Sequence, residues 1–515
     1  SYNPSNPTDY EIERLGTSGT DYLKTSDISK ASDQTFYLDA RVNYDRQFNL
    51  HHVTGMLMYM QREYRSSVLP ERNQGFSGRF TYDYGQRYLV ELNFGYNGTE
   101  RLAKKERFEF FPAVSLGWVI SNEKFFEPMT KYIDNLKIRG SYGLVGSDET
   151  GLSAGAQHFL YIDQVSLNNI GFTTGVDMNY TLYGPLVTNY AVVNGGWERV
   201  KKLDIGIDLE LFRQLTITAD YFNEKRYNIL LHREAWPESL GYYTAKPWSN
   251  KGKVDNWGIE LSVNWRKEFT KDLYVDFRGN FTYTENKYVN LDEPVYPYVW
   301  KTSTGKPLSR TTGYIAQGLF SSQEEIDNSP TQNLGSTVKP GDIKYRDVNG
   351  DGKIDGSDQV MISPYGTTPR IQYGLGMNVT YKKFDFGVFF NGSAKRTIMI
   401  SGISPFGQSD YNVMQFIADD YWSESNPNPN AKYPRLGLTS SQTANNTVAS
   451  TYWMRNGNFI RFKTLELGYK FKYGRVYLNG DNIAVFSPFK LWDPELSWNA
   501  YPLQRTFNIG VQLNF

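Results

Sequence analysis

The chain is organised by segments in which apolar and polar residues alternate one by one. From Thr506 to Phe515 every second side chain is apolar, and the residues between them are polar or glycine. Successive side chains of a β-strand point to opposite faces, so this pattern predicts a strand with one apolar and one polar face. About ten residues is also the length at which a tilted strand crosses a bilayer.

The same period recurs along the whole chain and predicts about fifteen strands. A period of two that is sustained over so many segments favours strands over helices. The predicted strands are 35–48, 51–65, 74–84, 87–97, 107–120, 134–146, 197–212, 215–231, 254–269, 273–289, 369–382, 384–397, 458–472, 475–487 and 505–515.

The connections between the predicted strands are of two kinds. Tight joints occur at 85–86, 213–214, 270–272, 382–383 and 473–474, and from residue 197 onwards they alternate strictly with long ones. Outer-membrane barrels have this asymmetry between short turns and long loops, whereas β-sandwiches do not follow such a rule. The sequence therefore predicts an all-β protein with a transmembrane antiparallel β-barrel, and a soluble multi-domain β protein is the alternative. The predicted long loops are about 147–196, 232–253, 290–368, 398–457 and 488–504.

The alternation also predicts an orientation. If the last strand runs toward the periplasm, the C-terminus and every tight turn are periplasmic, and the long loops and residues 1–34 lie outside. Bacterial single-chain barrels have an even number of strands, and a plugged transporter barrel has about 22. We therefore expect residues 1–515 to form the C-terminal part of a longer barrel, with about seven further strands and the plug domain elsewhere.

Composition supports a membrane barrel and argues against several other classes. Aromatic residues make up 16% of the chain, and membrane barrels use them as girdles at both interfaces. No run of about 18 apolar residues predicts a membrane-spanning helix. The formal net charge is zero, which gives no field for nucleic acid, and the absence of cysteine excludes thiolate sites. No catalytic motif or metal-binding histidine spacing is present, so no enzyme is expected.

Five segments resemble one known family. They are F-E-F-F-P-A-V-S-L-G-W-V-I-S (108–121), G-Y-I-A-Q-G-L-F (313–320), P-G-D-I-K-Y-R-D-V-N-G-D-G-K-I-D (340–355), D-Y-W-S-E-S-N-P-N-P-N-A-K-Y-P-R-L (420–436) and Y-P-L-Q-R-T-F-N-I-G-V-Q-L-N-F (501–515). Together, and in this order, they resemble the SusC/RagA family of TonB-dependent outer-membrane transporters.

The resemblance implies a function that the periodicity alone does not. Members of this family import large nutrients, usually glycans or peptides, across the bacterial outer membrane. It implies four partners: the N-terminal part of the same transporter, a SusD-like surface lipoprotein, TonB acting through the plug, and outer-membrane lipid. Two other interpretations stay open, a non-transporting outer-membrane adhesin and a soluble surface glycan-binding β protein.

One segment has the spacing of a calcium-binding loop. Oxygen side chains fall at positions 1, 3, 5, 9 and 12, glycine at position 6, and a backbone carbonyl is available at position 7. Calcium prefers six to eight such oxygen ligands, and we expect a structural Ca²⁺ here. An Asx-rich turn without metal is the alternative, because Asp, Asn and Gly also favour tight loops. The predicted ligands are Asp347, Asn349, Asp351, Lys353, Asp355 and Asp358.

Aromatic residues crowd the predicted long loops. Their rings offer a large contact area at low entropic cost, which suits a substrate or a protein partner, although loop packing would use the same residues. The terminal Phe515 resembles the assembly signal of bacterial outer-membrane barrels. The candidate contact residues are Trp236, Tyr242, Tyr243, Trp248, Trp300, Tyr421, Trp422 and Trp453.

Overall fold

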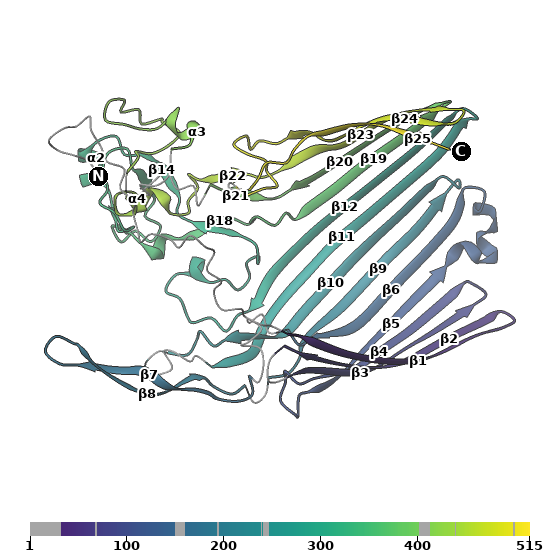
Figure 1. Ribbon diagram of the computed structural model, residues 1–515, viewed down its shortest axis with the longest axis horizontal. Helices are drawn as coiled ribbons and strands as arrows, with labels where there is room; N and C mark the ends of the chain where they lie inside the picture. The colour runs from purple at the N-terminus through teal and green to yellow at the C-terminus, as the bar shows by residue number, and fades with distance from the viewer. Residues whose placement is uncertain are drawn as a thin grey trace, which may run out of the picture.

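A computed structural model describes residues 32–66, 70–149, 160–192, 195–237, 239, 247–400, 413–437, 439–497 and 500–514. Its main element is one sheet of fifteen strands that follow one another in chain order, and every pair of neighbours is antiparallel (Figure 1). The predicted all-β class and the fifteen predicted strands are therefore confirmed.

The sheet curves into a trough of tilted strands (Figure 1). Its two outermost strands, β1 and β25, each have one neighbouring strand among the described residues, and every residue of β1 is exposed. The wall strands are β1 (Gln34–Phe48), β2 (His51–Arg65), β3 (Glu71–Tyr84), β4 (Tyr88–Thr99), β5 (Phe108–Val119), β6 (Ile133–Ser147), β9 (Glu198–Leu211), β10 (Leu215–His232), β11 (Trp248–Thr270), β12 (Leu273–Asn290), β19 (Ile371–Tyr381), β20 (Phe384–Ala394), β23 (Phe459–Phe471), β24 (Gly474–Phe486) and β25 (Thr506–Leu513).

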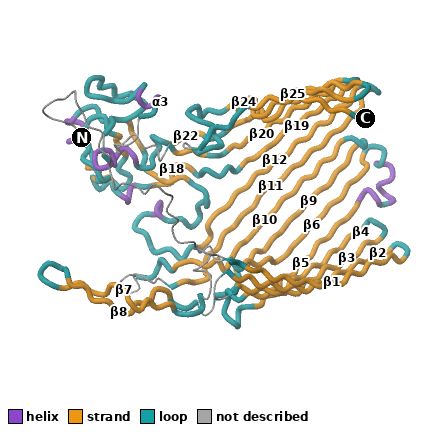
Figure 2. Tube along the Cα trace, viewed as in Figure 1, coloured by secondary structure: helices purple, strands orange, loops and turns teal. Residues whose placement is uncertain are grey.

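The tight turns gather at one end of the sheet, called the turn end below (Figure 2). At the β3–β4 turn both Gly85 and Gln86 have positive φ, 58° and 53°, as a two-residue hairpin turn that follows the twist of the strands requires. One connection at this end is longer and contains the 3-10 helices η1 (Ile120–Asn122) and η2 (Lys124–Met129). No helix among the described residues is long and apolar enough to span a membrane.

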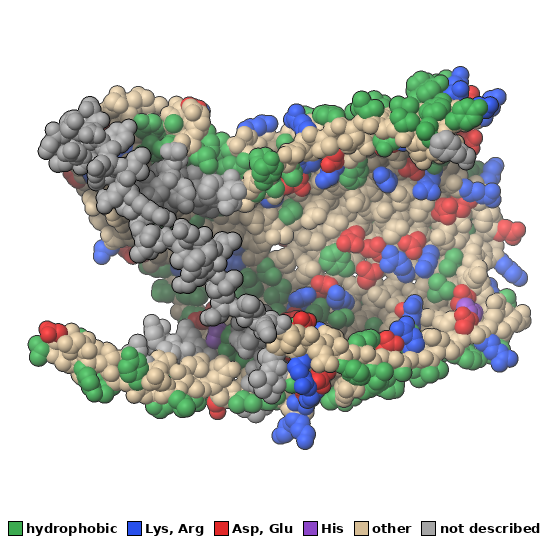
Figure 3. All heavy atoms as spheres, in the orientation of Figure 1, with side chains coloured by type: hydrophobic (Ala, Val, Ile, Leu, Met, Phe, Trp, Pro, Cys, Tyr) green, Lys and Arg blue, Asp and Glu red, His purple; other side chains and the backbone are tan. Residues whose placement is uncertain are grey.

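The two faces of the sheet differ as the alternation predicts. Leu209, Ile217 and Val263 stand opposite one another on three neighbouring strands, in one row of an apolar face. Figure 3 looks onto the concave face, where acidic and basic side chains are spread over the wall, while hydrophobic side chains gather along the outer rims. The apolar side chains of the wall strands therefore lie on the convex face.

The apolar band on the convex face has nearly the height of the lipid-facing band of outer-membrane barrels. On β11 its apolar residues run from Trp257 to Trp265, and eight residue steps at about 3.3 Å each give about 26 Å along the strand. For a strand tilted by about 40°, this corresponds to about 20 Å along the barrel axis, compared with about 25 Å in outer-membrane barrels.

The opposite end, called the loop end below, carries the long connections. One of them contains a projecting hairpin of β7 (Gln164–Thr174) and β8 (Tyr180–Asn189). The others hold short elements: η4 (Val299–Lys301), β13 (Thr311–Gly313), β14 (Ala316–Leu319), α2 (Gln323–Asp327), β15 (Thr331–Gln332), β16 (Ile343–Tyr345), β17 (Lys353–Ile354), η5 (Gly356–Asp358), β18 (Val360–Ser363), β21 (Thr397–Met399), α3 (Gln415–Ala418), α4 (Ser440–Thr447) and β22 (Met454–Asn456).

Two of these connections fold together, which the sequence did not predict. Residues 311–363 and the described part of 397–456 share one hydrophobic core, to which Phe489 of the connection before β25 also contributes, and we call this unit the loop domain (Figure 1, upper left). Ile343, Ile354 and Ile417 have no exposed surface. The loop domain thus has an interior like that of a soluble protein, because its apolar residues have no lipid to face.

The two histidines at the start of the second strand contact its neighbours. Both His51 and His52 belong to β2, within the predicted strand 51–65. The Nδ1 atom of His51 lies 2.8 Å from the hydroxyl of Tyr82, and the Nε2 atom of His52 lies 2.8 Å from a carboxylate oxygen of Asp45. These are contacts between neighbouring strands.

Candidate functional site: the inner wall and the loop domain

The inner wall carries clustered charges. Arg139 of β6 reaches three carboxylates: its guanidinium nitrogens lie 3.2 Å from Asp204, 3.3 Å from Asp208 and 2.5 Å from Asp220. Gly206 makes room for this cluster, because a Cβ atom there would lie 2.6 Å from Cζ of Arg139. Three acids thus surround one arginine, and Lys137 stands directly opposite Asp208 on the neighbouring strand.

A second cluster lies toward the other edge of the sheet. Arg475 of β24 pairs with Asp385 of β20 and Glu466 of β23. These side chains border a depression of about 940 Å³ in the wall, whose other lining residues include Gly374, Gly387 and Phe389. Asp204, Asp208 and Glu466 therefore lie on the concave face, where they contact Arg139 and Arg475.

Two candidate contact residues belong to the interior of the loop domain. Trp422 and Trp453 are only 6% and 3% exposed, and the indole N–H of Trp453 donates to the carbonyl of Asn446 at 2.7 Å. Trp422 packs over Gly341, where an added Cβ would lie 2.2 Å from the indole ring. Both rings are therefore core residues that pack the two connections together, and their contact with a ligand stays a prediction.

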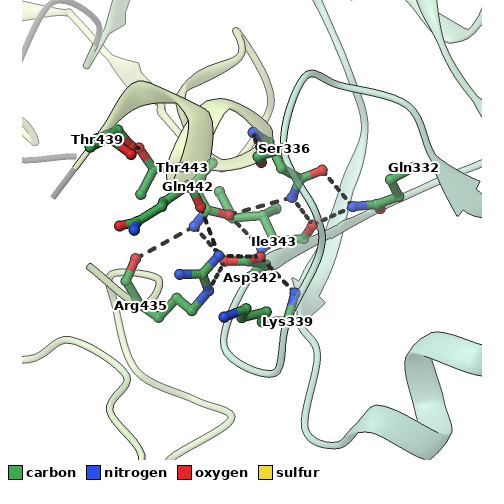
Figure 4. A network of polar contacts seen from close by, with 11 residues as sticks. Gln332, Ser336, Lys339, Asp342, Ile343, Arg435, Thr439, Gln442 and Thr443 are labelled. Carbon is green, nitrogen blue, oxygen red and sulfur yellow. Dashed lines mark hydrogen bonds and ion pairs between the residues drawn. The ribbon is translucent and has the colours of Figure 1, made fainter. Parts of the chain in front are cut away.

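A buried polar network joins the same two connections (Figure 4). The carboxylate of Asp342, which has no exposed surface, accepts hydrogen bonds from Nη2 of Arg435 at 3.0 Å and from the backbone N–H of Lys339 at 2.9 Å. The amide of Asn446 donates to it at 2.7 Å. Burial raises the pKa of the Asp342 carboxyl, while Arg435 opposes that shift by favouring the ionised form.

The network continues from Asp342 to the neighbouring amides. The side chain of Gln332 donates to the carbonyl of Ile343 at 2.9 Å and to the amide oxygen of Asn445 at 2.7 Å. The same Gln332 accepts the backbone N–H of Tyr345 at 2.7 Å. Buried groups with this many partners fix one arrangement, so the two connections form a single unit.

The other candidate aromatics are partly accessible. Trp300 stacks on Tyr298 with ring centroids 4.7 Å apart, and its indole N–H donates to the carbonyl of Ser357 at 2.8 Å. Trp248 lies against the ring of His232 at 3.6 Å. Trp236 and Tyr421 are half-buried. Tyr242, Tyr243 and Phe515 lie outside the described residues, so their predicted roles stay predictions.

The predicted calcium loop is held by its own backbone. The carboxylate of Asp347 accepts the N–H groups of Gly350 at 2.7 Å and Gly352 at 2.8 Å. The fully buried Asp358 accepts those of Val348 at 2.8 Å and Asp355 at 2.9 Å, so it does not fit the role of a metal ligand. Within the described ranges no group of three or more His, Cys, Asp or Glu is placed to hold a metal ion, and the calcium site stays a prediction.

Sequence reasoning missed the Asp342–Arg435 pair. A signal for it was present, because Asp342 belongs to the segment 340–355 and Arg435 to the segment 420–436, the segments that resemble the SusC/RagA family. Nothing in either segment alone says that they meet, since 93 positions separate the two residues.

Comparisons with known proteins agree with this architecture. The family model described as "TonB dependent receptor-like, beta-barrel" matches residues 1–483. TonB-dependent receptor SusC of Bacteroides thetaiotaomicron is 27% identical over 469 residues, which is 85% of this chain and 43% of that protein. TonB-dependent receptor P3 of Formosa agariphila is 25% identical over 478 residues, 85% of this chain and 45% of that protein.

Solved structures with a similar fold agree with the sequence matches. The solved structure of the RagAB peptide transporter superposes with a TM-score of 0.68 at 19% identity, over 94% of this chain and 55% of that one. The chain thus spans less than half the length of the curated relatives that it matches. The resemblance to SusC and RagA is confirmed, and the chain belongs to the TonB-dependent receptor β-barrel family of the outer membrane.

Proposed function

We propose that this chain forms the wall and outer loops of an importer for large polar nutrients, either glycans or oligopeptides. The observation that carries the proposal is the concave wall, which has both signs of charge at Arg139 and Asp220 and again at Arg475 and Asp385. A wall of this kind suits a hydrated path or a polar plug, whereas an adhesin that only binds at its loops needs no charged lumen.

The two edges of the sheet suggest the first partner. Among the described residues the outer edges of β1 and β25 have no neighbouring strand, and further strands of the same transporter would pair with their backbone groups. We propose that a plug carried with those strands contacts TonB, and that a SusD-like lipoprotein covers the loop end. In this arrangement the turn end is periplasmic and the loop end faces the exterior.

Uptake by intact cells tests the proposal. Cells in which the full transporter is the only route receive a labelled oligosaccharide pool or a labelled oligopeptide pool, with and without a protonophore. We expect accumulation of one pool, and we expect it to disappear when the proton-motive force is collapsed. Surface binding of a pool without accumulation would contradict import and favour the adhesin.

A further inference from the structure

The last connection of the chain, between β24 and β25, contacts both the loop domain and the wall. We call its residues 487–497 the strap. Phe489 is 4% exposed and belongs to the core of the loop domain, and Leu491 and Trp492 pack against that core. The turn that follows, 493–496, contacts the inner wall instead. One short segment is thus packed into the loop domain at one end and bound to the wall at the other.

A buried arginine of β23 holds the second part of the strap. Arg461 is 1% exposed, and its Nη2 donates to both carboxylate oxygens of Asp493, at 2.6 and 2.8 Å. Its Nε donates to the carboxylate of Glu495 at 2.6 Å. The neighbouring Ile460 is exposed and stands opposite the exposed Phe486, in an apolar pair on the convex face. Arg461 therefore points inward, and the strap covers it from the lumen side.

The turn of the strap is held by its own hydrogen bonds. The carboxylate of Asp493 accepts the backbone N–H of Glu495 at 3.0 Å, and the carbonyl of Asp493 accepts that of Leu496 at 3.0 Å. The indole N–H of Trp492 donates to the carbonyl of Leu496 at 3.2 Å. Because these bonds lie within the strap, they present its two carboxylates together, and Arg461 is the group that connects them to the wall.

The same guanidinium fixes the other end of this connection. Arg461 also donates to the side-chain oxygen of Asn482, which has a φ of 55° where the pairing of β23 with β24 shifts register. The amide of Asn482 in turn donates to the carbonyls of Leu503 and Gln504, both at 3.2 Å, just before β25 begins. The chain on both sides of the strap is thus tied to the surroundings of Arg461.

A second arginine interacts with the same carboxylates. Arg396 lies between β20 and β21, where the wall passes into the loop domain. Burial lowers the pKa of Arg396, while the charges of Glu495 and Asp493 oppose that shift. The two carboxylates of the strap are thus bonded to an arginine of the wall and attracted by an arginine at the border of the loop domain. The position of the strap is therefore determined mainly by charge at this end and by apolar packing at Phe489.

We propose that the strap is a latch that fixes the position of the loop domain on the barrel, and that Arg461 is the positioning residue that closes it. In a buried ion pair the cost of desolvation offsets much of the attraction, whereas removal of one partner leaves an unpaired charge. Such a contact can fix one arrangement without a large net gain in stability. With the latch open, we expect the loop domain to stay folded around its own core and to move relative to the wall. The inference concerns the attachment of the loop domain and does not depend on which nutrient is imported.

Distances between two spin labels test the latch in the full transporter, reconstituted in nanodiscs. E324C places one label on α2 of the loop domain and K271C places the other at the turn between β11 and β12, and both positions are exposed. We expect one narrow distance distribution with Arg461 present and at least a doubled width in R461Q. The matched control is R475Q, an arginine of the same inner wall whose two carboxylate partners both belong to wall strands. Its distribution should keep the width of the parent protein, and an unchanged width in R461Q would overturn the proposal.

A second variant tests whether Arg461 acts through the strap. D493N/E495Q should broaden the distribution as R461Q does, and R461Q added to it should broaden it no further, because the two changes open the same latch. Full additivity would overturn the proposal. Protection of 415–453 from protease should stay that of the wild type in every variant. Loss of that protection would mean that Arg461 stabilises the interior of the loop domain, and would overturn the latch as well.

Discussion

The wall and the loop domain solve the problem of apolar surface in opposite ways. In the wall, neighbouring strands are neighbours in the chain, and apolar side chains such as Leu261 point outward and stay 36% exposed. In the loop domain, residues far apart in the chain meet, as Gln332 and Asn445 do across 113 positions, and Ile343 is fully buried. The wall leaves its apolar face for lipid, whereas the loop domain builds its own core in water.

The use of tryptophan shows the difference. Trp257 is 36% exposed on the convex face of the wall, and Trp453 is 3% exposed inside the loop domain. The structural role of an aromatic residue in this sequence therefore depends on whether its surroundings are lipid-facing or buried. The comparison teaches that the stability of the two regions should respond to different substitutions, and each prediction below tests that separation.

The largest expected effect comes from Arg435→Ala in the loop domain. The substitution leaves the buried carboxylate of Asp342 without its cation, and breaking a buried pair from one side costs about 3–5 kcal/mol. We expect the loop domain to become protease-sensitive within 415–453, while the barrel keeps its heat-modifiable migration. Limited proteolysis of the detergent-extracted transporter measures this.

A double-mutant cycle provides the control. Once Asp342→Ala has removed the carboxylate, Arg435→Ala should cost far less than it does alone, because no buried charge is left unpaired. Equal costs in the two backgrounds would mean that the pair does not couple the two connections.

A matched pair on β11 tests the wall. Leu261→Lys places a charge near the middle of the apolar band, and Ser262→Lys places the same charge on the concave face. The outward lysine should cost about 2–4 kcal/mol and lower the amount of assembled barrel, whereas the inward lysine should cost little. Urea titration of the barrel in lipid measures the difference. Equal effects would contradict the assignment of the two faces.

The wall could be predicted from the sequence because each strand and each tight turn is determined by its own consecutive residues. Each strand shows its own period of two, and each joint shows its own length, so β10 (Leu215–His232) lies within one residue of the predicted 215–231. What the periodicity could not give is the connection through η1 and η2, since no tight-turn sequence marks it.

The loop domain could not be predicted because its core is formed by residues from connections that are far apart in the sequence. Period-two counting finds no long strands between 311 and 363, and the core there depends on Trp422 and Tyr433 from the following connection. The aromatic content suggested a contact surface, but burial decides the role of each ring. Even in the wall some contacts are not local, since Asp204 and Asp208 lie on β9 and their arginine partner comes from β6.

Gly341→Ala is expected to have a smaller effect on the loop domain. Gly341 has φ of 85°, and an added Cβ would lie 2.2 Å from the ring of Trp422. Overpacking of this kind costs about 1–3 kcal/mol. Gly305→Ala is the matched control, since Gly305 has the same φ of 85° with nothing within 4 Å of its Cβ position. Protection of 415–453 from protease should fall for Gly341→Ala and change less for Gly305→Ala.

The smallest expected effect concerns the predicted calcium loop. Because Asp358 is already engaged by Val348 and Asp355, a metal there would depend on the shorter set that includes Asp347 and Asp351, and we expect millimolar affinity. Calcium at about ten times its dissociation constant would then add about 1.4 kcal/mol to the loop, seen as slower proteolysis within 340–360 than in chelator.

Two variants separate the metal from the hydrogen bonds of the loop. Asp347→Ala with Asp351→Ala should abolish the difference between calcium and chelator. Asp358→Ala should weaken protection of the loop in both conditions, because it removes buried acceptors of backbone N–H groups that hold the turn without any metal. If the wild type is equally protected in calcium and in chelator, the loop is an Asx-rich turn without metal. Its acidic residues would then stabilise the loop domain by hydrogen bonds within the chain, as the Asp342 network does.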